Sequence, residues 1–326
     1  MNIPNLTVLA TGGTIAGKAD SATRHDYRPG QIGIEEFLGL VAELGIEANL
    51  KGEQIANIGS EDMSPAIWQR LHDAISAAIA DPNCDGVIVT HGTDTVEETA
   101  FLLDLTLPTT KPVVLVGAMR PATAVGYDGL RNFANAMRVA SDPEAAGRGV
   151  LVVMGDKVFA ARDVRKTRTR GTDAFQGFPR GSVGLVTPSS LDWFGAPWRV
   201  GDDAQFAFLA DLPDVPILFV HAGMTPDYVD RLVTEDTRGV VVSGVGEGNM
   251  PDPVRQALTA LAAQGMPVVR ASRLDEGLVD REPEDDENRF VAARALNPQK
   301  ARILLQMLIA AGDVEPATVQ RAFDGR

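Results

Sequence analysis

Short apolar runs alternate along the chain with longer segments in which apolar residues recur at helical spacing. The runs predict strands, and the longer segments predict helices. The strands are expected at 6–10, 86–90, 112–117, 149–154, 215–220, 239–243 and 267–270. The helices are expected at 34–44, 65–80, 95–105, 129–140, 226–234, 253–263, 298–311 and 316–323, several of them starting near a proline or an N-cap residue. Near-continuous apolar strands that alternate with helices predict parallel sheets covered by helices on both faces.

One stretch interrupts this alternation. Between Ser189 and Pro213 the chain is rich in turn-forming residues and shows no clear period. We therefore predict an α/β protein of two domains, with a larger N-terminal domain (1–190) built on a parallel-type sheet, a linker (191–213) and a smaller C-terminal α/β domain (214–326). The acidic segment 280–287, DREPEDDE, is expected to be a solvated loop.

The composition fits this picture and narrows the partners. The 326 residues can bury a sizeable core, and 44% hydrophobic with 23% charged residues is typical of a soluble globular protein. The formal net charge is −14 and no long basic run occurs, so nucleic acid is not expected as a partner. No apolar run approaches the ~18 residues of a membrane span, so a membrane is not expected as a partner either.

Cysteine and histidine usage gives no indication of a metal or a disulfide. Cys84 is the single cysteine, which excludes an intramolecular disulfide framework and a cysteine-based zinc site. The four histidines have no metal-ligand spacing, so no metal site is expected. The N-terminus has neither a charged start nor a long apolar core. We expect a cytoplasmic protein, or a periplasmic one if a leader preceded this sequence.

Two motifs rich in glycine and threonine follow predicted strands, TGGTIAG after 6–10 and THGTDTVEE after 86–90. Ligands of open α/β sheets bind beyond the carboxyl ends of the strands, which is where both motifs are expected. A phosphate loop is disfavoured, because TGGTIAGK has neither the glycine spacing of a dinucleotide loop nor a Ser or Thr after its lysine. GVGEGN (244–249) matches only in part and lies late in the chain.

Nucleophilic catalysis by threonine is the alternative. A hydroxyl is a weak nucleophile and needs a neighbouring base. Thr93 and Asp94 lie at a predicted strand-to-helix turn, where a hydroxyl can be exposed and backbone N–H groups can stabilise an oxyanion. The histidines offer no evident triad, and Lys166, in the cationic run RDVRKTRTR, is a candidate base. Spacing alone does not bring these residues together.

Four segments in the correct order carry a resemblance over nearly the whole chain. ATGGTIAG, THGTDTVEETAFLLDLT, VLVGAMRP and LNPQKARILLQ look like those of bacterial L-asparaginases, including the asparaginase–glutaminase branch. The resemblance implies a two-domain α/β fold, a homotetramer with active sites at subunit interfaces, no cofactor, and deamidation through a covalent acyl-enzyme.

The resemblance also assigns the reacting groups. Thr14 matches the primary nucleophile, and Tyr27 matches the tyrosine that assists it from a mobile lid. Thr93, Asp94 and Lys166 match a second catalytic constellation, in which the threonine positions or activates water or serves the second half-reaction. Asp94 would also bind the α-amino group of the substrate.

Further positions match substrate contacts. Ser60 and Glu61 match the pair that holds the α-carboxylate and α-amino groups of the substrate, although some relatives have Gln at the second position. A carboxylate there suits an ammonium group. Ala118 matches a backbone contact to the side-chain amide, and Gly13 is expected to border the substrate as well.

A neighbouring subunit would contribute the last two groups. Asn249 matches a residue that contacts the substrate amino group. The family glutamate before LNPQKAR aligns with Glu284 when counted forward from Gly277, and with Glu282 when counted back from Phe290. The two counts disagree because this chain is about two residues shorter than the family pattern in this loop. We assign the glutamate to Glu284.

The expected reaction is therefore hydrolysis of L-asparagine to L-aspartate and ammonia, with L-glutamine as a secondary substrate. Two alternatives share the fold: an ammonia-releasing subunit of a tRNA-dependent amidotransferase, and a non-enzymatic amino-acid-binding protein. The first is disfavoured because LTVLATGG begins at residue 6 and no basic surface is evident, and the second because Thr14, Thr93, Asp94 and Lys166 occur together. Preference between asparagine and glutamine depends on about one methylene, worth ~1–3 kcal/mol, and is not readable from the sequence.

Overall fold

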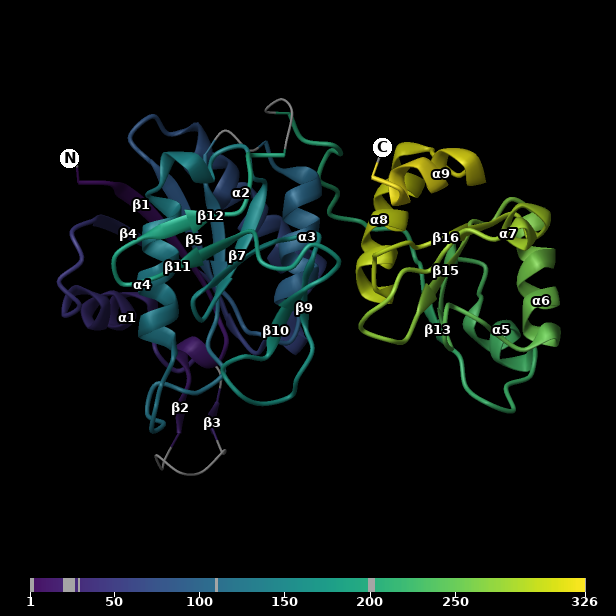
Figure 1. Cartoon of the computed structure of the whole chain (residues 1–326), viewed down its shortest axis with the longest axis horizontal. Coiled ribbons are helices and arrows are strands. Elements are labelled where there is room, and N and C mark those ends of the chain that lie inside the picture. Colours follow the sequence, from purple (N-terminus) through teal and green to yellow (C-terminus); the bar gives the residue numbers. More distant parts are fainter. Residues whose placement is uncertain (1–2, 20–26, 29, 109–110, 199–202, 326) are drawn as a thin grey trace. The chain divides into compact units, whose positions relative to one another are not determined.

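The computed structural model describes residues 3–19, 27–28, 30–108, 111–198 and 203–325. It divides into two compact units, Met1–Ala210 and Asp211–Arg326, coloured from purple through teal and from green through yellow in Figure 1. None of the helices in the described ranges is long and apolar enough to cross a membrane.

In the described part of the first unit, eight strands form one sheet in the order β12-β11-β8-β7-β6-β5-β1-β4. Their bounds are β1 Asn5–Gly12, β4 Asn49–Ile58, β5 Gly86–Thr90, β6 Val113–Val116, β7 Val150–Met154, β8 Lys157–Ala160, β11 Gly184–Val186 and β12 Leu191–Trp193. Strands β4, β1, β5, β6 and β7 run parallel, as expected, whereas β8, β11 and β12 each pair antiparallel with their neighbours.

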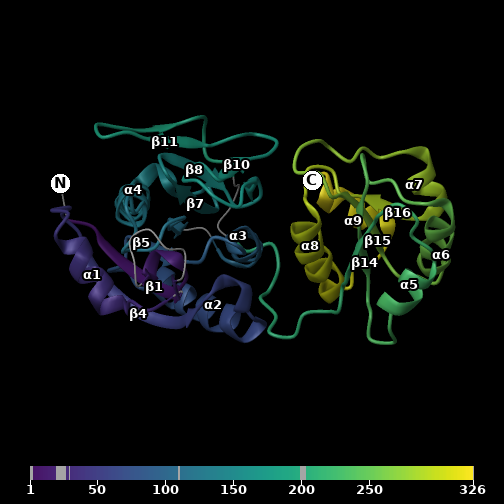
Figure 2. The same cartoon turned by 90° about the horizontal axis from the view of Figure 1, so that it is seen from below.

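Helices cover both faces of this sheet, and they are α1 Ile34–Ala42, α2 Pro65–Ala80, α3 Val96–Thr106 and α4 Gly129–Ala140. Figure 2 shows α1 and α4 on one side of β1 and β5, with α2 and α3 on the other. Alternate side chains of the same strand enter different cores: Val114 packs with Phe133 of α4, and Leu115 with Leu103 of α3. Burial on both faces explains why the central strands β6 and β7 are apolar at every position.

Short elements complete the unit at the carboxyl ends of the parallel strands. They are the one-turn helices η1 Thr14–Ala16 and η2 Ser60–Asp62, with η3 Pro143–Ala145 farther along, and the strand pairs β2 Lys18–Ala19 with β3 Tyr27–Arg28 and β9 Val164–Lys166 with β10 Phe175–Gly177. Thr14, Ser60, Tyr27 and Lys166 lie on these short elements, whereas Thr93 and Asp94 lie in the turn between β5 and α3.

The second unit is a smaller α/β layer. In its described residues, four parallel strands follow the order β13-β14-β15-β16, with bounds Ile217–Phe219, Val240–Gly244, Val268–Ser272 and Phe290–Ala292. Its helices are α5 Asp227–Leu232, α6 Asp252–Ala263, α7 Pro283–Asn288, α8 Pro298–Ala311 and α9 Pro316–Phe323. Figure 1 shows the strands between α8 on one side and α5 and α6 on the other.

The structure changes two expectations about the chain's organisation. Residues 191–193, expected in a linker, form β12 at the edge of the large sheet, and the first unit extends to Ala210. The acidic segment 280–287 is not simply a solvated loop, because residues 283–288 form helix α7 and Asp285 is buried. A buried arginine, Arg270, neutralises that carboxylate, which is why an acidic sequence can enter the core here.

Candidate active site

The turn after β1 can be built only with glycine. Gly12 and Gly13 have φ of +106° and +79°, a region that side chains with a Cβ disfavour. A Cβ on Gly13 would lie 2.4 Å from the backbone nitrogen of Gly92, and one on Gly12 would lie 2.5 Å from the carbonyl oxygen of Ile58. The turn therefore packs backbone against backbone on the ends of β4 and β5, and it brings Thr14, the first residue of η1, to this edge of the sheet.

The turn after β5 lies in the same place. A Cβ on Gly92 would lie 2.7 Å from Ser60 Oγ, so Ser60, in the turn after β4, touches this backbone directly. Asp94 N donates to Ser60 Oγ at 3.1 Å, and Thr95 Oγ1 donates to the Ser60 carbonyl at 2.8 Å. Three strand ends, those of β1, β4 and β5, thus converge on Gly13, Gly92 and Ser60.

Lys166 joins this group from a strand far away in the sequence. It ends β9, and its Nζ donates to Thr93 Oγ1 at 2.8 Å and to Asp94 Oδ1 at 2.5 Å. The lysine side chain is 15% exposed, whereas that of Asp94 is 62% exposed. An ammonium held against the Thr93 hydroxyl lowers the energy of negative charge that develops on that oxygen, and the exposed Asp94 carboxylate is open to a cation from solvent.

The end of β6 closes the other side of Thr93. A Cβ on Gly117 would lie 3.0 Å from Thr93 Cγ2 and 2.8 Å from the His91 carbonyl oxygen. Ala118, the next residue, is fully buried. One part of the first unit therefore brings together Gly13, Ser60, Thr93, Asp94, Lys166 and Ala118.

Two side chains that the sequence analysis did not single out hold the segment that begins at Gly117. Asp128 accepts hydrogen bonds of 3.0 Å from the backbone nitrogens of Met119 and Arg120, and Asn132 Nδ2 donates to the Gly117 carbonyl at 2.9 Å. A signal was present, because Asp128 directly precedes a predicted helix, where an aspartate is a common N-cap. In the structure this carboxylate binds the preceding loop and makes no capping hydrogen bond.

Tyr127 is a further residue without a sequence signal. Its Oη donates to the carbonyl oxygen of Ile15 at 2.7 Å, and Ala122 N donates to the Gly17 carbonyl at 2.9 Å. The loop after β6 therefore holds the segment that follows Thr14. Burial, with a smaller contribution from the charge of Asp128, raises the pKa of Tyr127 above its ordinary value, so the phenol stays neutral and donates.

Tyr27 lies in β3, which pairs with β2 so that Ala19 faces Tyr27 in register. The chain then returns toward the first motif, where Gly30 N donates to the Gly13 carbonyl at 3.1 Å. The Tyr27 backbone thus belongs to a ladder that starts four residues after Thr14; its side chain, and residues 20–26, lie outside the described structure. Glu61 is exposed, and its carboxylate lies over Gly59, where a Cβ would be 2.5 Å from either oxygen.

A buried hydrogen-bonded chain lies behind the second motif. Trp68 Nε1 donates to Thr99 Oγ1 at 2.9 Å, and the same hydroxyl lies 2.9 Å from His91 Nε2. Because the Gly92 carbonyl can only accept, His91 donates to it from Nδ1 at 2.7 Å, and in the neutral ring Nε2 then accepts from the Thr99 hydroxyl. Complete burial lowers the pKa of His91 to about 4, so the ring is neutral at neutral pH.

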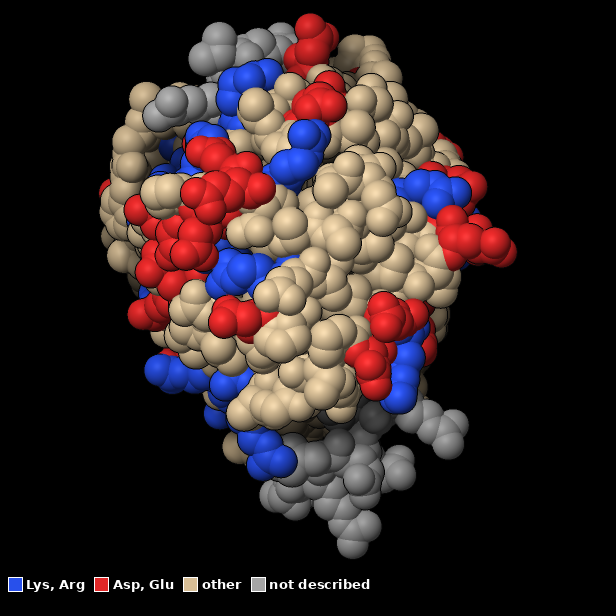
Figure 3. Space-filling model, turned by 90° about the vertical axis from the view of Figure 1, so that its right-hand side faces the viewer, with Lys and Arg blue, Asp and Glu red and all other residues tan. Residues whose placement is uncertain are grey.

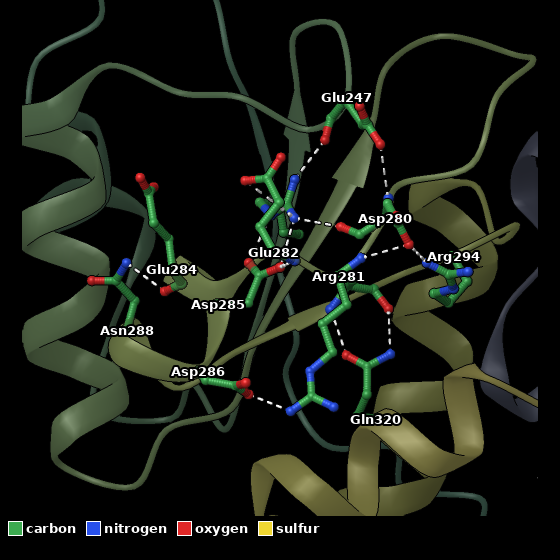
Figure 4. Close-up of polar contacts among 12 residues, drawn as sticks. Glu247, Asp280, Arg281, Glu282, Glu284, Asp285, Asp286, Asn288, Arg294 and Gln320 are labelled. Atoms are coloured by element: carbon green, nitrogen blue, oxygen red, sulfur yellow. Dashed lines mark hydrogen bonds and ion pairs between the residues drawn. The ribbon is translucent and has the colours of Figure 1, made fainter.

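Asn249, Glu282 and Glu284 belong to the second unit. Asn249 is exposed, in a turn closed by its own backbone pairing with Val245. Glu282 is the N-cap of α7, and in Figure 4 its carboxylate extends toward the turn that carries Glu247. Glu284 lies beside Asn288 in that view, and its carboxylate is 3.6 Å from Arg255 Nη1 of helix α6.

Both units match known family models in the expected order. Residues 5–199 match "Asparaginase, N-terminal", and residues 214–323 match "Glutaminase/Asparaginase C-terminal domain". The chain is 42% identical over 327 residues to "L-asparaginase 2" of Escherichia coli K12, covering 99% of this chain and 93% of that protein. It is 41% identical to "Probable L-asparaginase periplasmic" of Haemophilus influenzae, again with 99% and 93% coverage.

A more distant relative and a crystal structure extend these similarities. The chain is 38% identical to "Glutaminase-asparaginase" of Pseudomonas fluorescens biotype A, covering 94% of this chain and 86% of that protein. The crystal structure of a probable cytoplasmic L-asparaginase from Campylobacter jejuni superposes with a TM-score of 0.93 at 37% identity, covering 99% of this chain and all of that one. Since both units and nearly the full length match, this chain belongs to the bacterial L-asparaginase family.

Proposed function

We propose that the protein hydrolyses the side-chain amide of L-asparagine to L-aspartate and ammonia through a threonine ester. Relatives named as L-asparaginases at about 40% identity support the reaction. The observation that carries the site assignment is the backbone contact between Gly13 and Gly92, because it holds Thr14 and Thr93, each the next residue in its motif, at the same sheet edge. Lys166, bonded to Thr93 and Asp94, completes the group.

In the first half-reaction, Thr14 Oγ bonds to the amide carbon and Tyr27 helps to remove the hydroxyl proton. The carbonyl oxygen becomes an oxyanion, which backbone N–H groups near Thr93 and Ala118 stabilise. The tetrahedral intermediate collapses, the C–N bond breaks, and the nitrogen leaves with the added proton as ammonia. The product of this step is a β-aspartyl ester of Thr14.

In the second half-reaction, water attacks the ester carbon, Thr14 leaves as the hydroxyl, and aspartate is released. Thr93, with Lys166 donating to its oxygen, is positioned to orient or activate that water. Asp94 and Glu61 are assigned to the α-amino group, Ser60 to the α-carboxylate, and Gly13 to the border of the substrate. The high exposure of the Asp94 carboxylate supports its assignment, since a ligand cation can reach it.

We propose further that the enzyme is a homotetramer in which a neighbouring subunit completes each site with Asn249 and a glutamate. Of the two glutamates considered, Glu282 is now favoured over Glu284. The Glu284 carboxylate lies 3.6 Å from Arg255 Nη1 of α6, whereas the Glu282 carboxylate, which caps α7 and lies 3.9 Å from Arg270 Nη2, extends toward the turn that precedes Asn249. Asn249 and the glutamate must lie close together if both contact the same substrate molecule, and this requirement supports Glu282.

One experiment tests the reaction and its nucleophile together. Ammonia release is measured with purified protein alone, using L-asparagine and L-glutamine side by side, for wild type and Thr14→Ala. We expect release from asparagine without any partner protein, and a loss of about 10³-fold or more in the variant. Asparagine binding without turnover would instead support an amino-acid-binding protein, and wild-type-like turnover by Thr14→Ala would reject Thr14 as the nucleophile.

A further inference from the structure

Arg270 is a buried cation in the second unit that the proposed chemistry does not use. It lies on β15, between β14 and β16, and it is completely inaccessible to solvent. An unpaired guanidinium in such a place would be very costly, so its partners must compensate for the lost water. Those partners show what the residue holds together.

The first partner is Asp285, whose carboxylate is as buried as the arginine. Arg270 Nε donates to Asp285 Oδ1 at 2.8 Å, and Nη2 donates to Oδ2 at 2.6 Å, which is the bidentate geometry of a strong charge-assisted pair. Asp285 also accepts from the backbone nitrogen of Glu282 at 2.9 Å, as half of a capping box at the start of α7. The pair therefore fixes the end of the helix at which Glu282 lies.

Two further partners are backbone carbonyls from two separate loops, and the Glu282 carboxylate also lies 3.9 Å from Arg270 Nη2. Arg270 Nη1 donates to the Glu247 carbonyl at 2.6 Å, and Nη2 donates to the Asp280 carbonyl at 2.7 Å. The loops are also joined to each other, because Asp280 N donates to Glu247 Oε1 at 3.1 Å. Figure 4 shows Glu247, Asp280 and Asp285 arranged around this centre. One guanidinium thus binds the turn before Asn249, the loop before Glu282 and helix α7.

The turn itself is shaped to receive the arginine. Gly248 has φ of +89°, and a Cβ there would lie 2.9 Å from Arg270 Cγ. The turn is closed at its base by backbone hydrogen bonds of 2.9 and 2.7 Å between Val245 and Asn249. Although burial alone would lower the pKa of Arg270, the hydrogen bonds and charge of Asp285, with Glu282 and Glu247, raise it, so the cation is retained.

We propose that Arg270 and Asp285 are positioning residues that hold Asn249 and Glu282 in one fixed arrangement for presentation to a neighbouring subunit's active site. This inference rests on the proposed function, in which those two residues complete that site. The surroundings of Asn249 and Glu282 are exposed and acidic, and Figure 3 shows acidic side chains gathered along one side of the face it draws. Because these loops are exposed, the buried pair of Arg270 and Asp285 is what fixes their conformation.

A purely structural ion pair would look the same, so the variants must separate positioning from stability. Removing one partner leaves a buried charge and can prevent folding. We therefore choose the double variant Arg270→Met/Asp285→Leu, which leaves no orphan charge but removes the donors to both carbonyls. The matched control is Gln320→Met, which removes buried hydrogen bonds of 2.8 and 3.1 Å to the Ala292 backbone, in the same unit but in neither loop.

We expect both variants to lower Tm by similar amounts but to differ in kinetics. In the double variant, kcat/KM for asparagine falls about 10- to 100-fold, mostly through a higher KM, because misplaced contacts weaken substrate binding. Gln320→Met stays within about twofold of wild type, since it alters no loop that carries a substrate contact. Arg270→Lys keeps the positive charge but loses the bidentate geometry of the guanidinium, so its kcat/KM is expected to lie between those of the other two variants. If the double variant and Gln320→Met have the same kinetic constants, the inference is wrong.

Mixed oligomers test whether the effect crosses the subunit interface. Differently tagged Thr14→Ala and double-variant chains are co-expressed, and hybrids carrying both tags are isolated. In a two-fold pair, one site then combines both lesions and the other combines two intact halves, so about half of wild-type activity returns. Hybrid activity equal to the mean of the two parents would show that Arg270 acts only within its own subunit, and would overturn the inference alone. Wild-type protein that releases no ammonia from asparagine would overturn the proposed function, and the inference with it.

Discussion

Lys166 Nζ donates to Thr93 Oγ1 at 2.8 Å, although the two residues are 73 positions apart in the sequence. The contact joins the end of β9 to the turn after β5, and the same ammonium reaches Asp94. The lysine side chain is mostly buried, whereas that of Asp94 is mostly exposed. The Asp94 carboxylate is therefore the part of this ion pair that solvent or a ligand can reach. Lys166 therefore links the hydroxyl of Thr93 and the carboxylate of Asp94 in one charged group.

Lys166→Met should remove the ammonium while retaining the length and much of the bulk of the side chain. We expect kcat for asparagine to fall about 10²- to 10⁴-fold, the range typical of a lost proton-transfer or charge-stabilising group. The coupled ammonia assay measures this loss, and thermal melting shows whether the fold survives. Lys157→Met changes an exposed lysine of the same unit and is expected to be neutral. Equal rates for the two variants would remove Lys166 from the mechanism.

The sequence was most informative where chemistry follows a buried parallel strand. Strands β1 and β5 each contain an apolar run that ends shortly before a glycine and a threonine, so the sheet-edge position of Thr14 and Thr93 could be predicted. Strand β4 was missed because, in the described sheet, it is an edge strand beside β1 with a single fully buried residue, which leaves a mixed, polar sequence. The antiparallel β8, β11 and β12 are too short to show a period.

Residues that act through the backbone of another segment could not be predicted in the same way. Tyr127 donates to the Ile15 carbonyl in the segment after Thr14, and Asp128 accepts from backbone N–H groups of the loop after β6. Such contacts leave no spacing pattern in the sequence. Arg270 and Asp285 are 15 residues apart, and their charges predict solvent-exposed positions. The structure instead shows that both side chains are buried as a pair. The resemblance to asparaginases supplied the roles of Asn249 and the glutamate, which no periodicity indicates.

Tyr127→Phe should loosen the segment after Thr14. The change removes the 2.7 Å hydrogen bond to the Ile15 carbonyl and leaves that buried acceptor without this donor. We expect a loss of roughly 1–3 kcal/mol of stability in urea unfolding. We also expect turnover to fall about tenfold, because the nucleophile is held less closely. Tyr228→Phe, at an exposed position of the second unit, provides the control. A stability loss with unchanged turnover would limit Tyr127 to a structural role.

Gly13→Ala tests whether the contact between the two glycine turns is essential. The new Cβ would lie 2.4 Å from Gly92 N and 2.5 Å from Gly92 Cα, and neither backbone atom can move aside without displacing Thr93. A displacement of about 1 Å can cost ~10²-fold in rate, and we expect at least that loss of ammonia release. Gly45→Ala is the matched control, because Gly45 has a similar φ of +66° with no atom within 4 Å of its Cβ. If both variants keep wild-type activity, the close contact does not position the nucleophile.

His91 should make the protein less stable in mild acid. Its pKa is about 4 in the folded chain, against an ordinary value of 6.5. Between these values the unfolded state binds a proton that the folded state does not, so the free energy of unfolding falls as pH falls from 6.5 to 4. One such group changes stability by about 1.4 kcal/mol per pH unit, or about 3 kcal/mol over this window.

Urea unfolding at pH 7.5, 5.5 and 4.5, at fixed protein concentration, measures this dependence. His91→Gln removes the titrating group, so its stability should fall less steeply with pH than that of wild type, whereas His221→Gln in the second unit should follow wild type. The carboxylates contribute equally to all three proteins, so the difference between the curves isolates the imidazole. Parallel curves for wild type and His91→Gln would mean that His91 has the same pKa in the folded and unfolded chains, which would contradict the lowering of its pKa by burial.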